Sequence, residues 1–250
     1  MKLEEKTIKS AFQVYAEIYG KRKNWDLRHH VEMWQWARAA FVSNSFEDFE
    51  KVYDVLRGSW LVFRGKKKPW SAEETFNKLE GLDKSLMGTK LSNLLQRQLT
   101  DAWKLALSIA EIKRNKDGPS MVAISKFLHF WNPGLFVIVD REVVWNYVFR
   151  HTWLRDNLES VAEEIEKDLP SSITQHSDYK DCDFGYYPAI LWLYSKLIKE
   201  NPSIMMHFRE LILSHVKNAE RKISLQDHEA PAVEWLLIGL VELLPSGLTL

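Results

Sequence analysis

Apolar residues recur at helical spacing along most of the chain, and this pattern constrains the fold more than any other feature. In the central segment, Gly118-Pro119 precedes Ile124, Phe127, Leu128 and Trp131, which are three, four and seven residues apart and therefore share one helix face. Proline suits the first turn of such a helix, where its missing N–H costs no hydrogen bond. The pattern predicts an all-α protein of about ten helices, with the others near residues 4–22, 26–42, 45–56, 71–79, 91–113, 143–148, 156–169, 188–198, 202–216 and 231–244.

The connections between these segments are short, and neither an internal repeat nor an interdomain linker is visible. We therefore expect a single helical domain over residues 1–250, a compact bundle of two lobes, 1–115 and 116–250. The first three helices should form an antiparallel bundle. Residues 170–187 are polar and rich in turn-forming residues, which favours a long loop.

Charge and cysteine usage exclude several classes of protein. The 34 Lys and Arg residues balance 34 Asp and Glu residues, so a whole-molecule basic field is absent, although a local basic patch remains compatible with the sequence. The single cysteine, Cys182, cannot form an intrachain disulfide or a thiolate zinc cage, and it fits a reducing compartment. No apolar run approaches the roughly 20 residues that span a bilayer. We expect a cytoplasmic protein without a membrane partner.

Aromatic residues are abundant, with 11 Trp, 12 Phe and 8 Tyr. Most fall at helical core spacing, so a thick helical core is the favoured interpretation, and a pocket lining or a stacking surface for a base is the alternative. The histidine spacings do not suit a metal ion, because His29 and His30 diverge on a helix and His207 and His215 are two turns apart. We expect neither a metal nor a cofactor. His129, on the central helix, is the one histidine that invites a functional role.

The most informative acid follows the central helix. Asn132-Pro133-Gly134 ends that helix, and Leu135–Val139 is an unbroken apolar run that we expect to be buried. Asp140 then stands between this buried run and the start of the next helix. Such an acid is a candidate catalytic group. A helix N-cap, worth about 1 kcal/mol and without a catalytic role, is the simpler interpretation of Asp140.

The segment with helix-opening Gly118, the apolar connector and "FVIVDREV" resembles the core of the helix-hairpin-helix DNA glycosylase superfamily. The resemblance covers residues 105–150, and Gly118 and Asp140 are separated by 140 − 118 = 22 positions. It implies a helix-hairpin-helix-like centre, DNA as the partner and hydrolysis of an N-glycosidic bond. Asp140 would be the essential carboxylate, stabilising the positive charge that develops on the sugar while the target base is flipped into a pocket.

The same resemblance implies where DNA would bind. Helix N-terminal amides near Gly118 would hold a phosphate. The other candidate contacts are basic or polar residues near this segment or in the most basic run of the chain: Lys66, Lys67, Lys68, Ser120, Lys126 and Arg141. A solvated loop is the simpler interpretation of the basic run, and a polar helix edge is the simpler interpretation of Lys126.

The chain also departs from the family. Asp117-Gly118-Pro119 replaces a Gly-x-Gly turn, and Ser120 or Met121 stands where the strand-cutting members carry a lysine. The nearest lysine, Lys126, is two turns further along, so the sequence favours a monofunctional or inactive member. Two other functions stay open. One is a non-catalytic protein-interaction module, or a self-associating one, that uses the apolar helix face at Leu236–Leu244. The other is a small-molecule pocket between two helical lobes.

Overall fold

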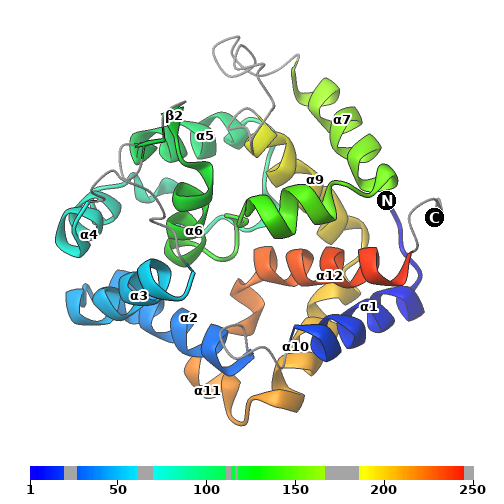
Figure 1. Cartoon of the computed structure of the whole chain (residues 1–250), viewed down its shortest axis with the longest axis horizontal. Helices are drawn as coiled ribbons and strands as arrows, with labels where there is room; N and C mark the ends of the chain where they lie inside the picture. The colour runs from blue at the N-terminus through cyan, green and yellow to red at the C-terminus, as the bar shows by residue number, and fades with distance from the viewer. Residues whose placement is uncertain (20–26, 61–69, 111–113, 116–117, 167–185, 245–250) are drawn as a thin grey trace.

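The computed structural model describes residues 1–19, 27–60, 70–110, 114–115, 118–166 and 186–244, and the described part is all-α (Figure 1). Ten of its α-helices have nine residues or more, which confirms the predicted class and number. The β structure in this part is one antiparallel ladder of two residues a strand, β1 (Arg114–Asn115) and β2 (Gly118–Pro119). No helix of the described ranges is long and apolar enough to cross a membrane.

The helices before the ladder are α1 (Glu5–Ile18), α2 (Leu27–Val42), α3 (Phe46–Gly58), α4 (Ala72–Glu80) and α5 (Gln98–Ser108). Short 3-10 turns precede α5: η1 (Lys84–Leu86) and η2 (Leu91–Asn93). The helices after it are α6 (Met121–Trp131), the π-helix η4 (Arg141–Val148), α7 (Thr152–Glu166), α9 (Tyr187–Glu200), α10 (Ser203–His215), α11 (Ala219–Lys222), the 3-10 turn η6 (Leu225–Asp227) and α12 (Glu229–Leu243).

Helix α12 is at the centre of the molecule, and α1 lies along it (Figure 1). The two backbones approach so closely that a Cβ on Gly239 would stand 2.0 Å from the carbonyl oxygen of Ala11. Glycine is required here because any side chain would meet backbone rather than a movable side chain. Helix α1 also packs on α10, so the expected antiparallel bundle of the first three helices is wrong. The division into lobes at residue 115 stays a prediction.

Two predicted helix starts are confirmed by their caps. The Ser45 hydroxyl accepts a hydrogen bond from the Asp48 amide, and Ser71 forms a complete capping box with Glu74. These bonds satisfy amide groups that a helix leaves unpaired in its first turn. The helix predicted over residues 156–169 begins earlier than expected, because α7 starts at Thr152.

The long helix predicted over residues 91–113 is also wrong, because only Gln98–Ser108 is α-helical there. The backbone around Leu91 is engaged with distant parts of the chain: its amide donates to the Gly134 carbonyl over 2.9 Å, and its carbonyl accepts from the Ser195 hydroxyl over 2.7 Å. These tertiary hydrogen bonds replace the helical ones, and propensity alone does not reveal them.

Candidate functional site

The turn after α6 is fixed by one buried side chain, Asn132. Its Nδ2 donates to the carbonyl oxygens of Leu86 and Thr89 over 2.7 and 3.0 Å, and its Oδ1 accepts from the Gly134 amide over 3.0 Å. These bonds use both ends of the amide and join the turn to the backbone at Leu86 and Thr89. The chain is thereby turned back along α6.

The apolar connector of residues 135–139 is buried, as predicted, and α6 holds it through polar side chains. The Ser125 hydroxyl accepts from the Val139 amide over 3.0 Å, and His129 Nδ1 lies 2.9 Å from the carbonyl oxygen of Phe136. These two contacts keep the connector extended along one face of α6. They deliver the next residue, Asp140, to the position beside Lys126.

Asp140 uses its two carboxylate oxygens in different ways. Oδ1 accepts from the Val143 amide over 3.2 Å, which is the helix cap that the sequence suggests, while Oδ2 accepts from Lys126 Nζ over 3.0 Å. The Lys126 side chain is 2% exposed and that of Asp140 is 21% exposed, so the ion pair is reached from the carboxylate side. The ammonium of Lys126 also lies 5.5 Å from the centre of a Trp60 ring, within range of a cation–π attraction.

The helix that Asp140 caps is a π-helix, since the Trp145 amide donates to the carbonyl of Asp140, five residues earlier, over 3.0 Å. Extended π-helices are rare and are often found at functional sites. The wider turn is a local irregularity in the backbone directly next to the ion pair.

The ion pair lines a pocket of about 110 Å³. A cavity of about 150 Å³ accepts benzene, so this pocket is somewhat smaller than one ring requires, and its walls must move apart to receive a nucleobase. The walls are largely aromatic and come from six parts of the chain: Tyr15, Tyr19, His30, Trp60, Lys126, His129, Ile138, Asp140, Val143, Pro231, Glu234, Trp235 and Ile238. The rings of Tyr15 and Trp235 are stacked on each other, with centroids 4.7 Å apart, and Tyr15 also stacks on Tyr19, with centroids 5.5 Å apart.

Glu234, on α12, is the second carboxyl group of the pocket. The residue as a whole keeps some exposure, but its Oε2 has no solvent contact and no hydrogen-bond partner, so the acidic end itself is buried. This burial raises the pKa of Glu234 to about 8; the Asp140 charge adds to the effect, and Lys126 and the Ile138 amide oppose it. The pocket therefore contains one ionised carboxylate in an ion pair and one carboxyl group that is protonated at neutral pH.

His129 has a structural role in this site. Burial lowers its pKa to about 3, so the ring is neutral, and its Nε2 accepts from Trp34 Nε1 over 3.3 Å while Nδ1 faces the Phe136 carbonyl. A neutral imidazole has one donor and one acceptor, and both are used. Among the described residues, no three His, Cys, Asp or Glu side chains are placed to hold a metal ion.

The other predicted site residues are not gathered at the pocket. Lys66, Lys67 and Lys68 lie outside the described residues, as does Cys182. Gly118 is in strand β2, opposite Asn115, so a helix-hairpin-helix centre is not confirmed. Ser120 is buried at the N-cap of α6, and Arg141 is the first residue of η4.

The expectation that Lys126 lies on a polar helix edge is wrong. Its stem and its ammonium are both buried, and the charge is compensated by Asp140 rather than by solvent. Sequence spacing also misses Glu234, Trp235 and Tyr15. For Glu234 a signal exists: it is the one charged residue between Ala230 and Val241, in the most buried helix of the fold.

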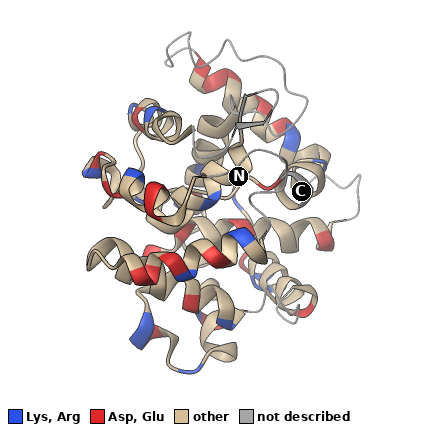
Figure 2. Cartoon of the chain, turned by 60° about the vertical axis from the view of Figure 1, so that its left-hand side comes forward, with Lys and Arg blue, Asp and Glu red and all other residues tan. Residues whose placement is uncertain are grey.

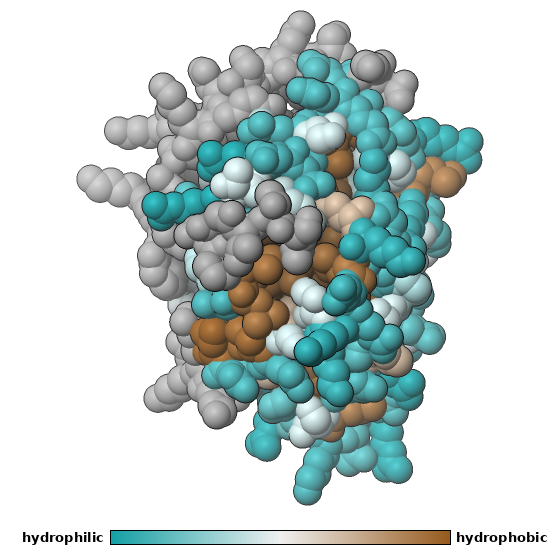
Figure 3. Space-filling model, turned by 90° about the vertical axis from the view of Figure 1, so that its right-hand side faces the viewer, coloured by the Kyte–Doolittle hydropathy of each residue, from teal (hydrophilic) through white to brown (hydrophobic). Residues whose placement is uncertain are grey.

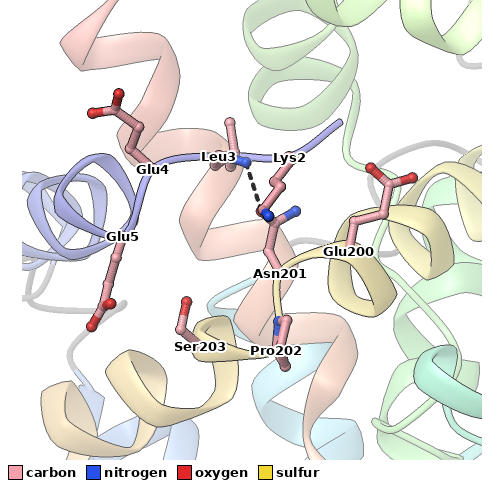
Figure 4. Close-up of a pocket in the computed structure, with 8 residues that line it drawn as sticks. All are labelled: Lys2, Leu3, Glu4, Glu5, Glu200, Asn201, Pro202 and Ser203. Carbon is pink, nitrogen blue, oxygen red and sulfur yellow. Dashed lines mark hydrogen bonds between the residues drawn. The ribbon is translucent and has the colours of Figure 1, made fainter.

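Two of the larger hollows lie elsewhere on the surface. The hollow of about 590 Å³ in Figure 4 is formed by the N-terminal segment and the α9–α10 junction, where the Leu3 amide donates to Asn201 Oδ1 over 2.7 Å. Its ionisable side chains Glu4, Glu5 and Glu200 point in different directions rather than toward one another (Figure 4). Another, of about 600 Å³, lies between α10 and η6. Neither unites a carboxylate with a buried amine, so the smaller pocket is the candidate site.

Acidic and basic side chains are interspersed over the helices drawn in Figure 2, in agreement with the balanced composition. The chain matches no protein-family model, no curated protein and no solved structure. Conclusions about function therefore depend on the geometry of the Asp140–Lys126 pocket.

Proposed function

We propose that this protein is a DNA-glycosylase-like hydrolase that receives a flipped base in the aromatic pocket and places the attached sugar beside Asp140. The observation that carries the proposal is the Asp140–Lys126 ion pair at a pocket of about 110 Å³ that is lined in part by aromatic side chains. Aromatic faces bind bases by stacking, which contributes about 1–3 kcal/mol per base.

Breaking an N-glycosidic bond generates positive charge on the sugar carbon C1′ and its ring oxygen. A carboxylate next to C1′ stabilises this charge most when it is already ionised and oriented, because no reorganisation is then needed. Lys126 favours the ionised form of Asp140 through its hydrogen bond, and the Val143 amide fixes the direction of the carboxylate. The cap and the catalytic role are thus compatible in one residue.

The position of Lys126 favours a second form of the reaction. Its Nζ lies 3.0 Å from Asp140 Oδ2, and a lysine nitrogen acts as a nucleophile only as a neutral amine, after it has given up a proton. Such an amine could attack C1′ and expel the base, forming a covalent bond between the lysine and the sugar. The sequence favours a monofunctional protein because no lysine follows Gly118 closely, but the fold brings Lys126 to the acid despite their separation of 14 residues.

Basic residues follow two of the pocket residues in the sequence. Tyr19 is followed by Gly20-Lys21-Arg22-Lys23, and Trp60 is followed by the run that contains Lys66–Lys68. Both segments lie outside the described residues, so they support the proposal through their charge and their position in the sequence. Several Lys or Arg contacts to phosphates supply most of the non-specific affinity of proteins for DNA.

The competing interpretation, a protein-interaction module, loses its proposed surface. Leu236, Leu237 and Leu240 are buried in the core, so this helix face is not available to a partner. Hydrophobic residues do gather in the middle of the face shown in Figure 3, with hydrophilic side chains around them. A molecular mass that rises with protein concentration would favour this alternative.

Two measurements test the proposed function. The first is binding to duplex DNA that contains an abasic-site analogue, compared with the intact duplex at rising salt; we expect tighter binding to the analogue and a steep loss of affinity with salt. The second is release of a base from duplexes that each contain uracil, hypoxanthine, 8-oxoguanine or N7-methylguanine. Borohydride reduction during the reaction would trap the Lys126 intermediate. Absence of both binding and base release would reject the proposal.

A further inference from the structure

Glu234 has a position that the pairing of Asp140 with Lys126 does not explain. It lines the same pocket from α12, with Pro231 one turn before it and Ile138 of the connector close by. Its neighbours along the helix, from Ala230 to Val241, are otherwise uncharged. Burying an acid in such a helix disfavours folding unless the group is neutral, and a leucine or glutamine would fit the helix better.

The two oxygens of Glu234 are in different surroundings. The Ile138 amide donates a hydrogen bond to the carboxyl group, whereas Oε2 is shielded from solvent and has no hydrogen-bond partner. A protonated carboxyl carries one O–H donor, and the unpartnered oxygen is the place for it. The group therefore has one oxygen without a partner among the described residues, in a side chain that lines the pocket.

We propose that Glu234 is the general acid of the reaction at this site, transferring its carboxyl proton to a ring nitrogen or exocyclic oxygen of the departing base. The inference deepens the proposed function, on which it rests. It assigns the substrate class as a neutral base with a hydrogen-bond acceptor on the edge that faces α12.

The step balances. The C1′–N bond breaks and its electron pair passes to the base, which takes the proton from Glu234 and leaves as a neutral molecule. The positive sugar is stabilised by Asp140 and captured by a water molecule, whose oxygen forms the new bond to C1′. The proton that this water loses returns to Glu234. Asp140 thus stabilises the sugar as a carboxylate, and Glu234 protonates the base as a carboxylic acid.

The surroundings of Glu234 keep its carboxyl group protonated beside the carboxylate of Asp140. The charge of Asp140 disfavours a second negative charge on Glu234. Lys126 favours ionisation of Glu234, but burial opposes it more strongly. With the resulting pKa of about 8, roughly nine in ten Glu234 groups are protonated at pH 7. The buried phenols of Tyr187 and Tyr194 on α9 have pKa values well above 10, and His129 stays neutral. The remaining ionisable side chains of the pocket are His30, Tyr15 and Tyr19.

The test compares wild type with Glu234→Gln in single-turnover base release. Glutamine keeps the size and a hydrogen-bond donor but cannot transfer a proton. General acid catalysis contributes about 10²–10⁴-fold, so we expect a loss of at least about 100-fold on a neutral base. The wild-type rate should fall as pH rises through about 8, and this fall should be absent from the variant. N7-methylguanine, which is already positively charged, is the matched control, and its release should change by less than about threefold.

The outcomes separate this inference from the proposed function. If wild type releases no base from any duplex, both are rejected. If wild type is active and Asp140→Asn is not, but Glu234→Gln matches wild type at every pH, the role of Glu234 as general acid is rejected. The proposed role of Asp140 at this pocket is then retained. An equal loss on neutral and cationic bases would also reject it, because it would show a structural effect. A carboxyl NMR titration of Glu234 in the intact protein provides a readout that does not depend on activity.

Discussion

Replacing Glu234 by glutamine should change how the stability of the protein depends on pH. The unfolded chain releases the Glu234 proton near pH 4.5, whereas the folded protein keeps it up to about pH 8. The folded state therefore holds more protons within this window, and its free energy of unfolding falls as pH rises from 4.5 to 8. Glutamine does not titrate, so the variant lacks this loss.

The size of the effect follows from the two pKa values. A difference of about 3.5 corresponds to about 5 kcal/mol at 1.36 kcal/mol for each pH unit, reached above pH 8, and to about 3 kcal/mol at pH 7. Solvent contact of the partly exposed Glu234 stem reduces these figures, so we expect the variant to gain about 2–4 kcal/mol relative to wild type between pH 5 and pH 8.5.

Urea denaturation of both proteins at pH 5, 7 and 8.5 measures this gain directly. The difference between their free energies of unfolding removes the contributions of titrating groups that behave alike in both proteins. The reasoning would be refuted by a stability difference that stays constant within about 0.5 kcal/mol across the three pH values, because Glu234 would then ionise in the folded state as it does in the unfolded chain.

Three further predictions concern the fold around the site. Gly239→Ala should lower the free energy of unfolding by about 3 kcal/mol, because the new Cβ meets the Ala11 carbonyl, whereas Gly58→Ala, with nothing within 4 Å, should be neutral or stabilising in the same thermal melts. Asn132→Ala should cost about 3 kcal/mol in urea denaturation, since it removes three buried hydrogen bonds; a loss under 1 kcal/mol would contradict this. In the Glu234→Gln background, stability should decrease as pH falls from 6.5 toward 4, because unfolding exposes to protonation His129 and His228, whose folded pKa values are about 3 and about 4; a flat profile would argue against neutral buried imidazoles.

The helical class was predictable because it depends on spacing alone. The positions of Ile124, Phe127 and Leu128 determine a helix face whatever surrounds them, and the three are buried as expected. The serine caps at residues 45 and 71 were equally readable, because a capping bond forms between residues three apart. Local patterns of this kind are complete within a few residues of sequence.

Only part of the candidate site could be predicted from the sequence. Asp140 stood out because it follows a buried run directly, but Lys126 is 14 residues away and Glu234 is 94 residues further on. Their meeting depends on the turn fixed by Asn132 and on the packing of α12, both of which are long-range effects. The short helix at residues 98–108 has the same cause, since the hydrogen bonds that Leu91 makes with the Gly134 carbonyl and the Ser195 hydroxyl compete with the local helical pattern.

The central claim is that Asp140 is a catalytic carboxylate as well as a helix cap, and Asp140→Asn tests it most directly. Asparagine can still accept the Val143 amide, so the helix start is kept, although the buried Lys126 loses its counter-charge and we expect a loss of about 2–3 kcal/mol in stability. The assay is single-turnover base release below the melting midpoint, with the exposed Asp156→Asn as the matched control. We predict that Asp140→Asn reduces the rate at least about 1,000-fold while Asp156→Asn equals wild type. A folded Asp140→Asn protein that releases the base as fast as wild type would contradict the account.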